Sequence, residues 1–161
     1  MKFIKSIIPV LVSFFLIGNS NAQTVYGTYD SATGNASVTA TSTSLTQKFR
    51  NSLNDQGAQI SDFRFITYPD GNNFLLVALV GNSSNNIRSV GIEMVPGPGG
   101  TILARSGGPG PTVEYLHSCT GNPCENCELK ININTMPPDV FCRCQWQGTC
   151  NHTVQATIGW K

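Results

Sequence analysis

The sequence has few charged residues: they make up 12% of it, with 10 lysines and arginines against 9 aspartates and glutamates. They are scattered along the chain and form no basic stretch. Proteins that bind nucleic acid or anionic membranes need a concentrated positive surface, because phosphate backbones and lipid headgroups are both negatively charged. We therefore expect neither kind of partner for this chain.

Long hydrophobic runs are missing after the first residues. The longest later run, residues 74–80, is too short to cross a bilayer, which takes about 20 residues of helix. The sequence therefore predicts no stable membrane insertion of the mature chain.

The chain begins instead with the layout of a secretory signal. Lys2 and Lys5 precede an apolar run over residues 7–17, and Ser20 and Ala22 supply the small residues that a signal peptidase needs. We expect residues 1–22 to be a signal peptide that is cleaved after Ala22. The mature protein is then secreted, in an extracellular or periplasmic location.

Common catalytic motifs are also missing. The sequence contains no G-x-S-x-G, no phosphate-binding loop with a lysine and no H-E-x-x-H. We therefore predict a non-enzymatic protein without a cofactor, which has a binding or structural role. Its protein or surface partner is not identified by any motif.

Removal of the signal leaves 139 residues (161 minus 22), enough for one hydrophobic core or a core with a smaller appendage. Two Gly/Pro runs, residues 96–100 and 107–111, interrupt any regular structure. The second run is the predicted boundary between a first unit, residues 23–111, and a cysteine-rich β module, residues 112–161.

One helix is predicted in the first unit. Ser44 and Gln47 fit a capping box, and Gly57 stands where a left-handed cap would end the helix. One face of this helix carries apolar residues at four-residue spacing: Leu45, Phe49 and Leu53. A single apolar stripe indicates a helix that lies on a sheet.

Alternating or continuous apolar patterns predict strands on both sides of that helix. The predicted strands are residues 24–29, 62–68, 74–80, 87–95 and 101–104. The turn at residues 69–72 joins two of them in a hairpin, 74–80 is expected to be central, 87–95 to have one solvated face, and 30–43 to be a loop. The predicted fold class is α+β: an antiparallel β-meander with one packed helix, followed by a small disulfide-stapled β module.

All six cysteines lie near the C-terminus, in the pattern C-x4-C-x2-C-x14-C-x-C-x5-C. They are Cys119, Cys124, Cys127, Cys142, Cys144 and Cys150. An even number in an exported chain indicates a disulfide framework, although fifteen pairings are possible. Because Cys142 and Cys144 point to the same side of a strand, we expect each to bond to the arm that contains residues 119–127.

A metal site is the alternative interpretation of this cluster. The two histidines of the protein, His117 and His152, lie two residues outside the first and last cysteines, Cys119 and Cys150. Imidazole and thiolate groups are the usual ligands of zinc and copper. Redox exchange at Cys124 and Cys127 is a third possibility for the same segment.

Two short motifs suggest further properties. Residues 23–27, Gln-Thr-Val-Tyr-Gly, resemble the inhibitory loop motif of cystatins, which implies an inhibitor of an exported enzyme; in that family the motif follows the helix, whereas here it precedes it. Asn35, Asn82 and Asn151 each begin an N-glycosylation sequon.

The C-terminal third carries a wider resemblance. Residues 117–127, His-Ser-Cys-Thr-Gly-Asn-Pro-Cys-Glu-Asn-Cys, together with Cys142-Arg143-Cys144 and Cys150-Asn151-His152, resemble small secreted cysteine-rich proteins of Bacteroidota-type bacteria. The resemblance implies a bacterial envelope or extracellular setting and no particular activity.

Overall fold

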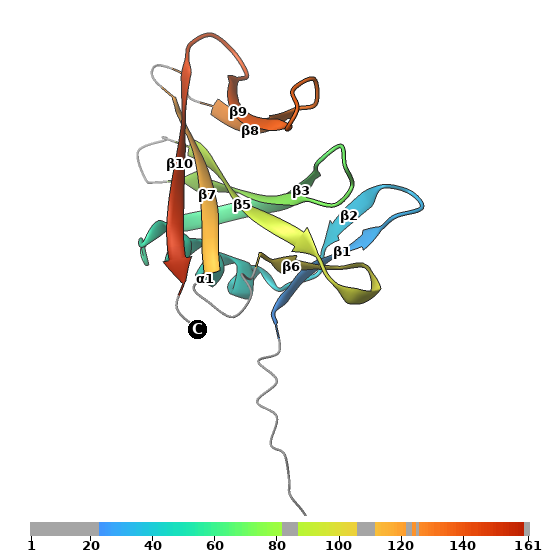
Figure 1. The fold of residues 1–161 in the computed structure, drawn as a ribbon. Coiled ribbons are helices and arrows are strands. Elements are labelled where there is room, and N and C mark those ends of the chain that lie inside the picture. Colours follow the sequence, from blue (N-terminus) through green and yellow to red (C-terminus); the bar gives the residue numbers. More distant parts are fainter. Residues whose placement is uncertain (1–22, 82–86, 106–111, 122–123, 125, 160–161) are drawn as a thin grey trace, which may run out of the picture.

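The described part of the protein is mostly antiparallel β-sheet with one helix, as the computed structural model in Figure 1 shows. The structure describes residues 23–81, 87–105, 112–121, 124 and 126–159, so the predicted signal peptide lies outside the described residues. Among the described residues, no helix has the length and hydrophobicity that crossing a membrane requires.

The elements are β1 (Val25–Asp30), β2 (Asn35–Val38), α1 (Ser42–Leu53), β3 (Gln59–Thr67), β4 (Phe74–Gly81), β5 (Ile87–Pro96), a 3₁₀ turn (Pro98–Gly100), β6 (Thr101–Ala104), β7 (Thr112–Gly121), β8 (Asn126–Asn132), β9 (Asp139–Cys144) and β10 (Cys150–Gly159). The predicted strands correspond to β1, β3, β4, β5 and β6. The predicted loop at residues 30–43 is wrong in part, because β2 pairs with β1 in a hairpin there.

Strand β5 is the centre of the sheet. It pairs with β4 along one edge. Along its other edge it pairs with β6 and β7, both antiparallel, and over two residues with β8, which is parallel. Strand β10 pairs with β7, and β9 pairs with β8. The predicted boundary at residue 111 therefore falls between strands of one continuous sheet, since β7 and β8 both pair with β5.

The helix begins and ends at residues other than those predicted. The side chain of Thr41, not Ser44, caps its start by accepting a hydrogen bond from the backbone N–H of Ser44. Asn54, not Gly57, adopts the left-handed conformation at its end, with φ of 52°. Thr41 and Asn54 both have short polar side chains that suit these positions. Each helix cap therefore lies three residues before the residue that was predicted for it.

Two hydrophobic cores lie on opposite faces of the sheet. The helix side contains Leu45 and Phe49 of α1, as predicted, packed with Phe74 and Leu76 of β4. The other side contains the next residues of β4, which are Leu75 and Val77, packed with the β8–β9 hairpin. Because successive side chains of a strand point to opposite faces, β4 is buried along its length, which confirms that it is covered on both faces; it pairs with β3 along one edge and with β5 along the other.

One face of β5 was expected to be solvated, and this expectation is wrong. Ser89 on that face is fully buried, and Gly91 is buried beside it. The β8–β9 hairpin covers them: a Cβ atom on Gly91 would lie 2.9 Å from Cδ1 of Leu129 in β8. The cover comes from a segment about forty residues further along the chain, which the local pattern of β5 cannot reveal.

Candidate functional site

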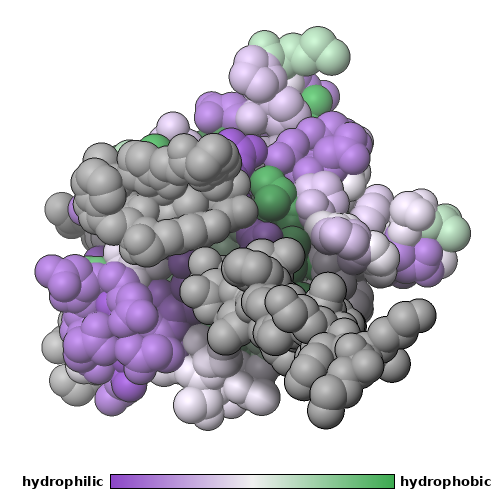
Figure 2. Space-filling model, turned by 60° about the horizontal axis from the view of Figure 1, so that its bottom comes forward, coloured by the Kyte–Doolittle hydropathy of each residue, from purple (hydrophilic) through white to green (hydrophobic). Residues whose placement is uncertain are grey.

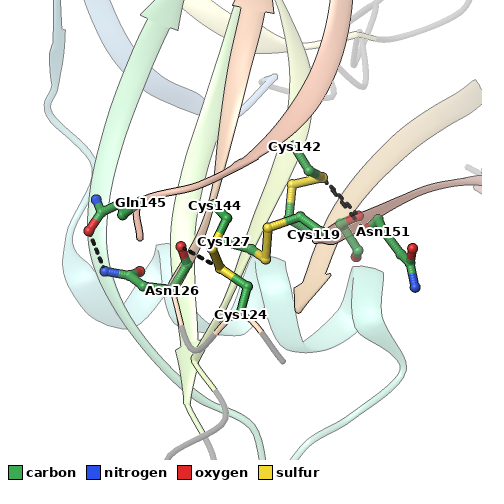
Figure 3. Close-up of a disulfide and its surroundings, with 10 residues drawn as sticks. Cys119, Cys124, Asn126, Cys127, Cys142, Cys144, Gln145 and Asn151 are labelled. Atoms are coloured by element: carbon green, nitrogen blue, oxygen red, sulfur yellow. Dashed lines mark hydrogen bonds between the residues drawn. A yellow bond between two sulfur atoms is a disulfide. The ribbon is translucent and has the colours of Figure 1, made fainter. Parts of the chain in front are cut away.

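Three disulfides hold the β8–β9 hairpin on the sheet (Figure 3). They join Cys119 to Cys142, Cys124 to Cys144, and Cys127 to Cys150, with Cα–Cα distances of 5.6, 5.9 and 5.9 Å. Each bond connects the arm that contains residues 119–127 with the arm that contains residues 142–150. The prediction that Cys142 and Cys144 both bond across to the first arm is confirmed.

Hydrogen bonds surround the disulfides at the ends of the hairpin (Figure 3). The amide of Asn126 donates to the side-chain oxygen of Gln145 at 2.6 Å, and the backbone N–H of Gln145 donates to the carbonyl of Asn126 at 3.2 Å.

Disulfides persist in oxidising compartments and are rare in the reducing cytosol. The three disulfides therefore indicate an oxidising location outside the cytoplasm.

The metal interpretation needs thiolates from Cys119 and Cys150. Both sulfurs are in disulfides, and none of the six cysteines is free. The Sγ atoms of Cys124, Cys127 and Cys150 lie within 4.8 Å of one another, but this closeness reflects two adjacent disulfides. In this oxidised form the sulfurs do not offer the thiolates that zinc requires.

The two histidines do come together, on the face of the sheet that carries the hairpin. His152 of β10 lies opposite Cys119 in the β7–β10 register, and His117 lies two residues before Cys119 in β7. This diagonal neighbourhood places Nδ1 of His117 at 3.2 Å from Nε2 of His152. His117 is buried, with 6% of its surface exposed, and His152 is partly buried.

The imidazole rings meet edge to edge. Their planes are within 10° of parallel and their centroids are 5.4 Å apart. The centroid distance exceeds the 3.2 Å between the nitrogens by about two ring radii, so both nitrogens lie close to the line that joins the rings. This is the geometry of an N–H···N hydrogen bond. A tetrahedral metal would need the two lone pairs to converge on a point beside that line.

Glu93 of β5 extends the pair to a chain of three groups. Its Oε1 lies 3.2 Å from Nε2 of His117, on the side of the ring away from His152. Its Oε2 lies 3.7 Å from Nη1 of Arg105. The other terminal nitrogen of Arg105, Nη2, donates to Oδ1 of Asn73 at 3.2 Å. No motif or spacing in the sequence marks Glu93 as a site residue. The pairing of Gly91 with His117 brings β5 beside the histidines, and sequence spacing does not reveal this register.

The charges and burial at this site shift two pKa values. Burial lowers the pKa of His152, with a smaller contribution in the same direction from the neighbouring His117, while Asp139 opposes the shift. Burial also raises the pKa of Tyr68 to about 12, and the negative charge of Glu93 adds to that shift. The surroundings therefore favour neutral His152 and neutral Tyr68.

The remaining predicted site residues are not members of the Glu93–His117–His152 group. Asn35 in β2 and Asn151 in β10 are exposed, and Asn82 lies outside the described residues. Of the cystatin-like motif, Val25 and Tyr26 belong to β1, which pairs with β2 and β6, and Tyr26 is buried. The motif is therefore part of the sheet and does not form a hairpin tip.

Comparisons with known proteins add no relative: no protein-family model, curated protein or solved structure matches the chain.

Proposed function

We propose that the chain is an exported, non-enzymatic protein with a binding or structural role, and that its disulfide-stapled hairpin presents the contact residues. One observation carries the proposal: large apolar side chains are exposed at both ends of β9. Met136, in the turn between β8 and β9, is fully exposed, and Trp146, in the connection from β9 to β10, is 83% exposed.

The disulfides fix the hairpin that carries these side chains. Cys142 holds β9, and the connection that contains Trp146 lies between two bonded cysteines, Cys144 and Cys150. A rigid loop loses less conformational entropy when it binds, and tryptophan is prominent among the residues that dominate protein interfaces. Exposed Trp146 and Met136 on a fixed hairpin are therefore suited to contact a partner outside the cytoplasm.

On the face in Figure 2, the described residues are mostly hydrophilic or of intermediate hydropathy, and hydrophobic ones appear in small, separate areas. Trp146 and Met136, by contrast, are large apolar side chains with most of their surface exposed, and we assign the contact to them.

Site-specific photocrosslinking in the native host tests this proposal. A photoreactive phenylalanine analogue replaces Trp146 or Met136, and the matched control replaces Ser31, which is exposed in the β1–β2 turn. We expect the two hairpin positions to form the same discrete crosslinked species outside the cytoplasm, and Ser31 to form none. The absence of that species at both hairpin positions, or its formation equally at Ser31, would contradict the assignment.

Thiol counting and elemental analysis of the purified mature protein test the framework itself. We expect no free thiol before reduction, six after reduction, and no stoichiometric zinc or copper. Free thiols together with bound metal would instead support the metal-binding alternative.

A further inference from the structure

The hydrogen bonds that link Glu93, His117 and His152 require one arrangement of protons on the two imidazole rings. The Glu93 carboxylate only accepts hydrogen bonds, so Nε2 of His117 carries a proton and donates it. The facing nitrogens, Nδ1 of His117 and Nε2 of His152, then need a single proton between them. If both rings are protonated, two N–H groups face each other 3.2 Å apart and neither accepts a hydrogen bond.

Strand β10 has few other side-chain contacts with the rest of the protein. Over residues 150–157 every side chain is exposed except those of Cys150 and His152. Cys150 is held by its disulfide to Cys127, and the strand otherwise pairs with β7 through its backbone. His152 is therefore the one side chain, besides the disulfide, that anchors this part of β10 to the face below it.

We propose that Glu93, His117 and His152 form an acid-sensitive latch, which holds β10 against β7 at neutral pH and loosens that pairing when both histidines are protonated. Loosening would uncover the hydrogen-bonding edge of β7, and an exposed strand edge is a template on which another strand can pair. The disulfide at Cys150 keeps the start of β10 attached, so the change is local.

The charged groups around the latch come from several elements. Glu93 of β5 contacts His117 directly, and Arg105, which follows β6, lies against Glu93 on its other side. Asp139 of β9 favours a charge on His152, whereas burial and the neighbouring His117 oppose it. Tyr68, which follows β3, is neutral in this range because its pKa is about 12.

The direction of the pH effect follows from the lowered pKa of His152. The unfolded strand binds the proton more readily than the latched one, so acid favours the open form. The latch contribution is complete above the ordinary pKa of 6.5 and is lost as the pH falls through the lower value of the folded protein. Between those two values, the ratio of closed to open strand falls by roughly tenfold for each pH unit.

Amide hydrogen exchange on the intact, disulfide-bonded protein tests the latch. Protection of the amides of residues 153–157, corrected for intrinsic exchange, is compared between pH 7 and pH 5 in buffer with a chelator. We expect protection to fall in β10 and to stay unchanged in β4. Equal protection of β10 at the two pH values overturns the proposal.

A substitution identifies the histidine as the cause. His152→Gln keeps an amide that can donate and accept a hydrogen bond but cannot take up a proton, so the fall in protection should disappear. The control Thr153→Gln, at an exposed neighbouring position, should retain it. A fall that persists in His152→Gln overturns the proposal.

An NMR titration of the unmodified protein covers the case in which His152→Gln does not fold. We expect the ring signals of His152 to titrate below the ordinary midpoint of 6.5 and to change together with the β10 amide signals. A midpoint of the His152 titration at or above 6.5, or β10 amide signals that do not change together with the His152 signals, would contradict the proposal.

Discussion

At the scale of single residues, one tight packing constraint lies where β5 meets the hairpin. Gly91 lies opposite His117 in the β5–β7 register and beneath the side chains of Leu75 and Leu129. From its sequence, the face of β5 that carries Gly91 was expected to be solvated. The contact with Leu129 depends on how the hairpin is folded over, which the local pattern of β5 does not show.

Gly91→Ala should lower the free energy of unfolding by about 1–3 kcal/mol, because the added methyl group would overpack the second core. Its Cβ would lie 2.9 Å from both Cγ of Leu75 and Cδ1 of Leu129. Chemical denaturation measures the change. The control Gly81→Ala, where no atom lies within 4 Å of the added Cβ, should be close to neutral; equal losses in the two variants would contradict the packing argument.

At the scale of elements, the helix and the hairpin differ in how far they follow from local sequence. The apolar stripe of α1 is confirmed, because Leu45 and Phe49 are buried and Leu53 packs against the same core. Its ends differ from the prediction because several Ser and Thr residues precede it, and each could cap the helix. The residue that caps the helix depends on where β2 ends, because the chain enters the helix directly after that strand.

The two assignments of the helix start make different predictions. Thr41→Ala should lower the free energy of unfolding by about 1 kcal/mol, because the backbone N–H of Ser44 loses its acceptor. Ser44→Ala should change it by less than about 0.5 kcal/mol, because that side chain makes no capping bond. Thermal or urea unfolding of both variants distinguishes them, and the reverse order would restore Ser44 as the cap.

Removal of one disulfide should weaken the attachment of the hairpin. The bond between Cys119 and Cys142 closes a loop with a sequence separation of 23 residues, for which chain entropy predicts a loss of about 3 kcal/mol. Both cysteines are replaced by alanine, so that no free thiol remains to exchange. Denaturant unfolding measures the loss, and a change below about 1 kcal/mol would show that the bond constrains the chain little.

At the scale of the whole molecule, the cysteine-rich segment and the preceding strands depend on each other. Strand β5 pairs with β7 and β8, and the second core joins Leu75 and Val77 with Leu129 and Val140. Without the segment, one face of β4 and β5 would lose its cover. The disulfides therefore support a core that extends beyond the cysteine-rich segment itself.

This dependence predicts that residues 23–111 do not fold alone. We expect the truncated chain to show poorly dispersed NMR signals and no cooperative unfolding, because Leu75 and Val77 would be exposed to water. The matched control is the chain of residues 23–161 with its disulfides intact. A cooperative transition in residues 23–111 would support the division at residue 111 that the Gly/Pro run suggests.

The sequence by itself determined what depends on local pattern: the strand-rich chain, the apolar face of α1, the buried β4 and the pairing of cysteines between two arms. The tertiary structure decided what depends on register and on which face is covered. Cys127 and Cys144 lie opposite each other in the β8–β9 hairpin, yet each bonds outside it. Glu93 joins the histidines only because β5 pairs with β7, a long-range contact whose register no local periodicity specifies.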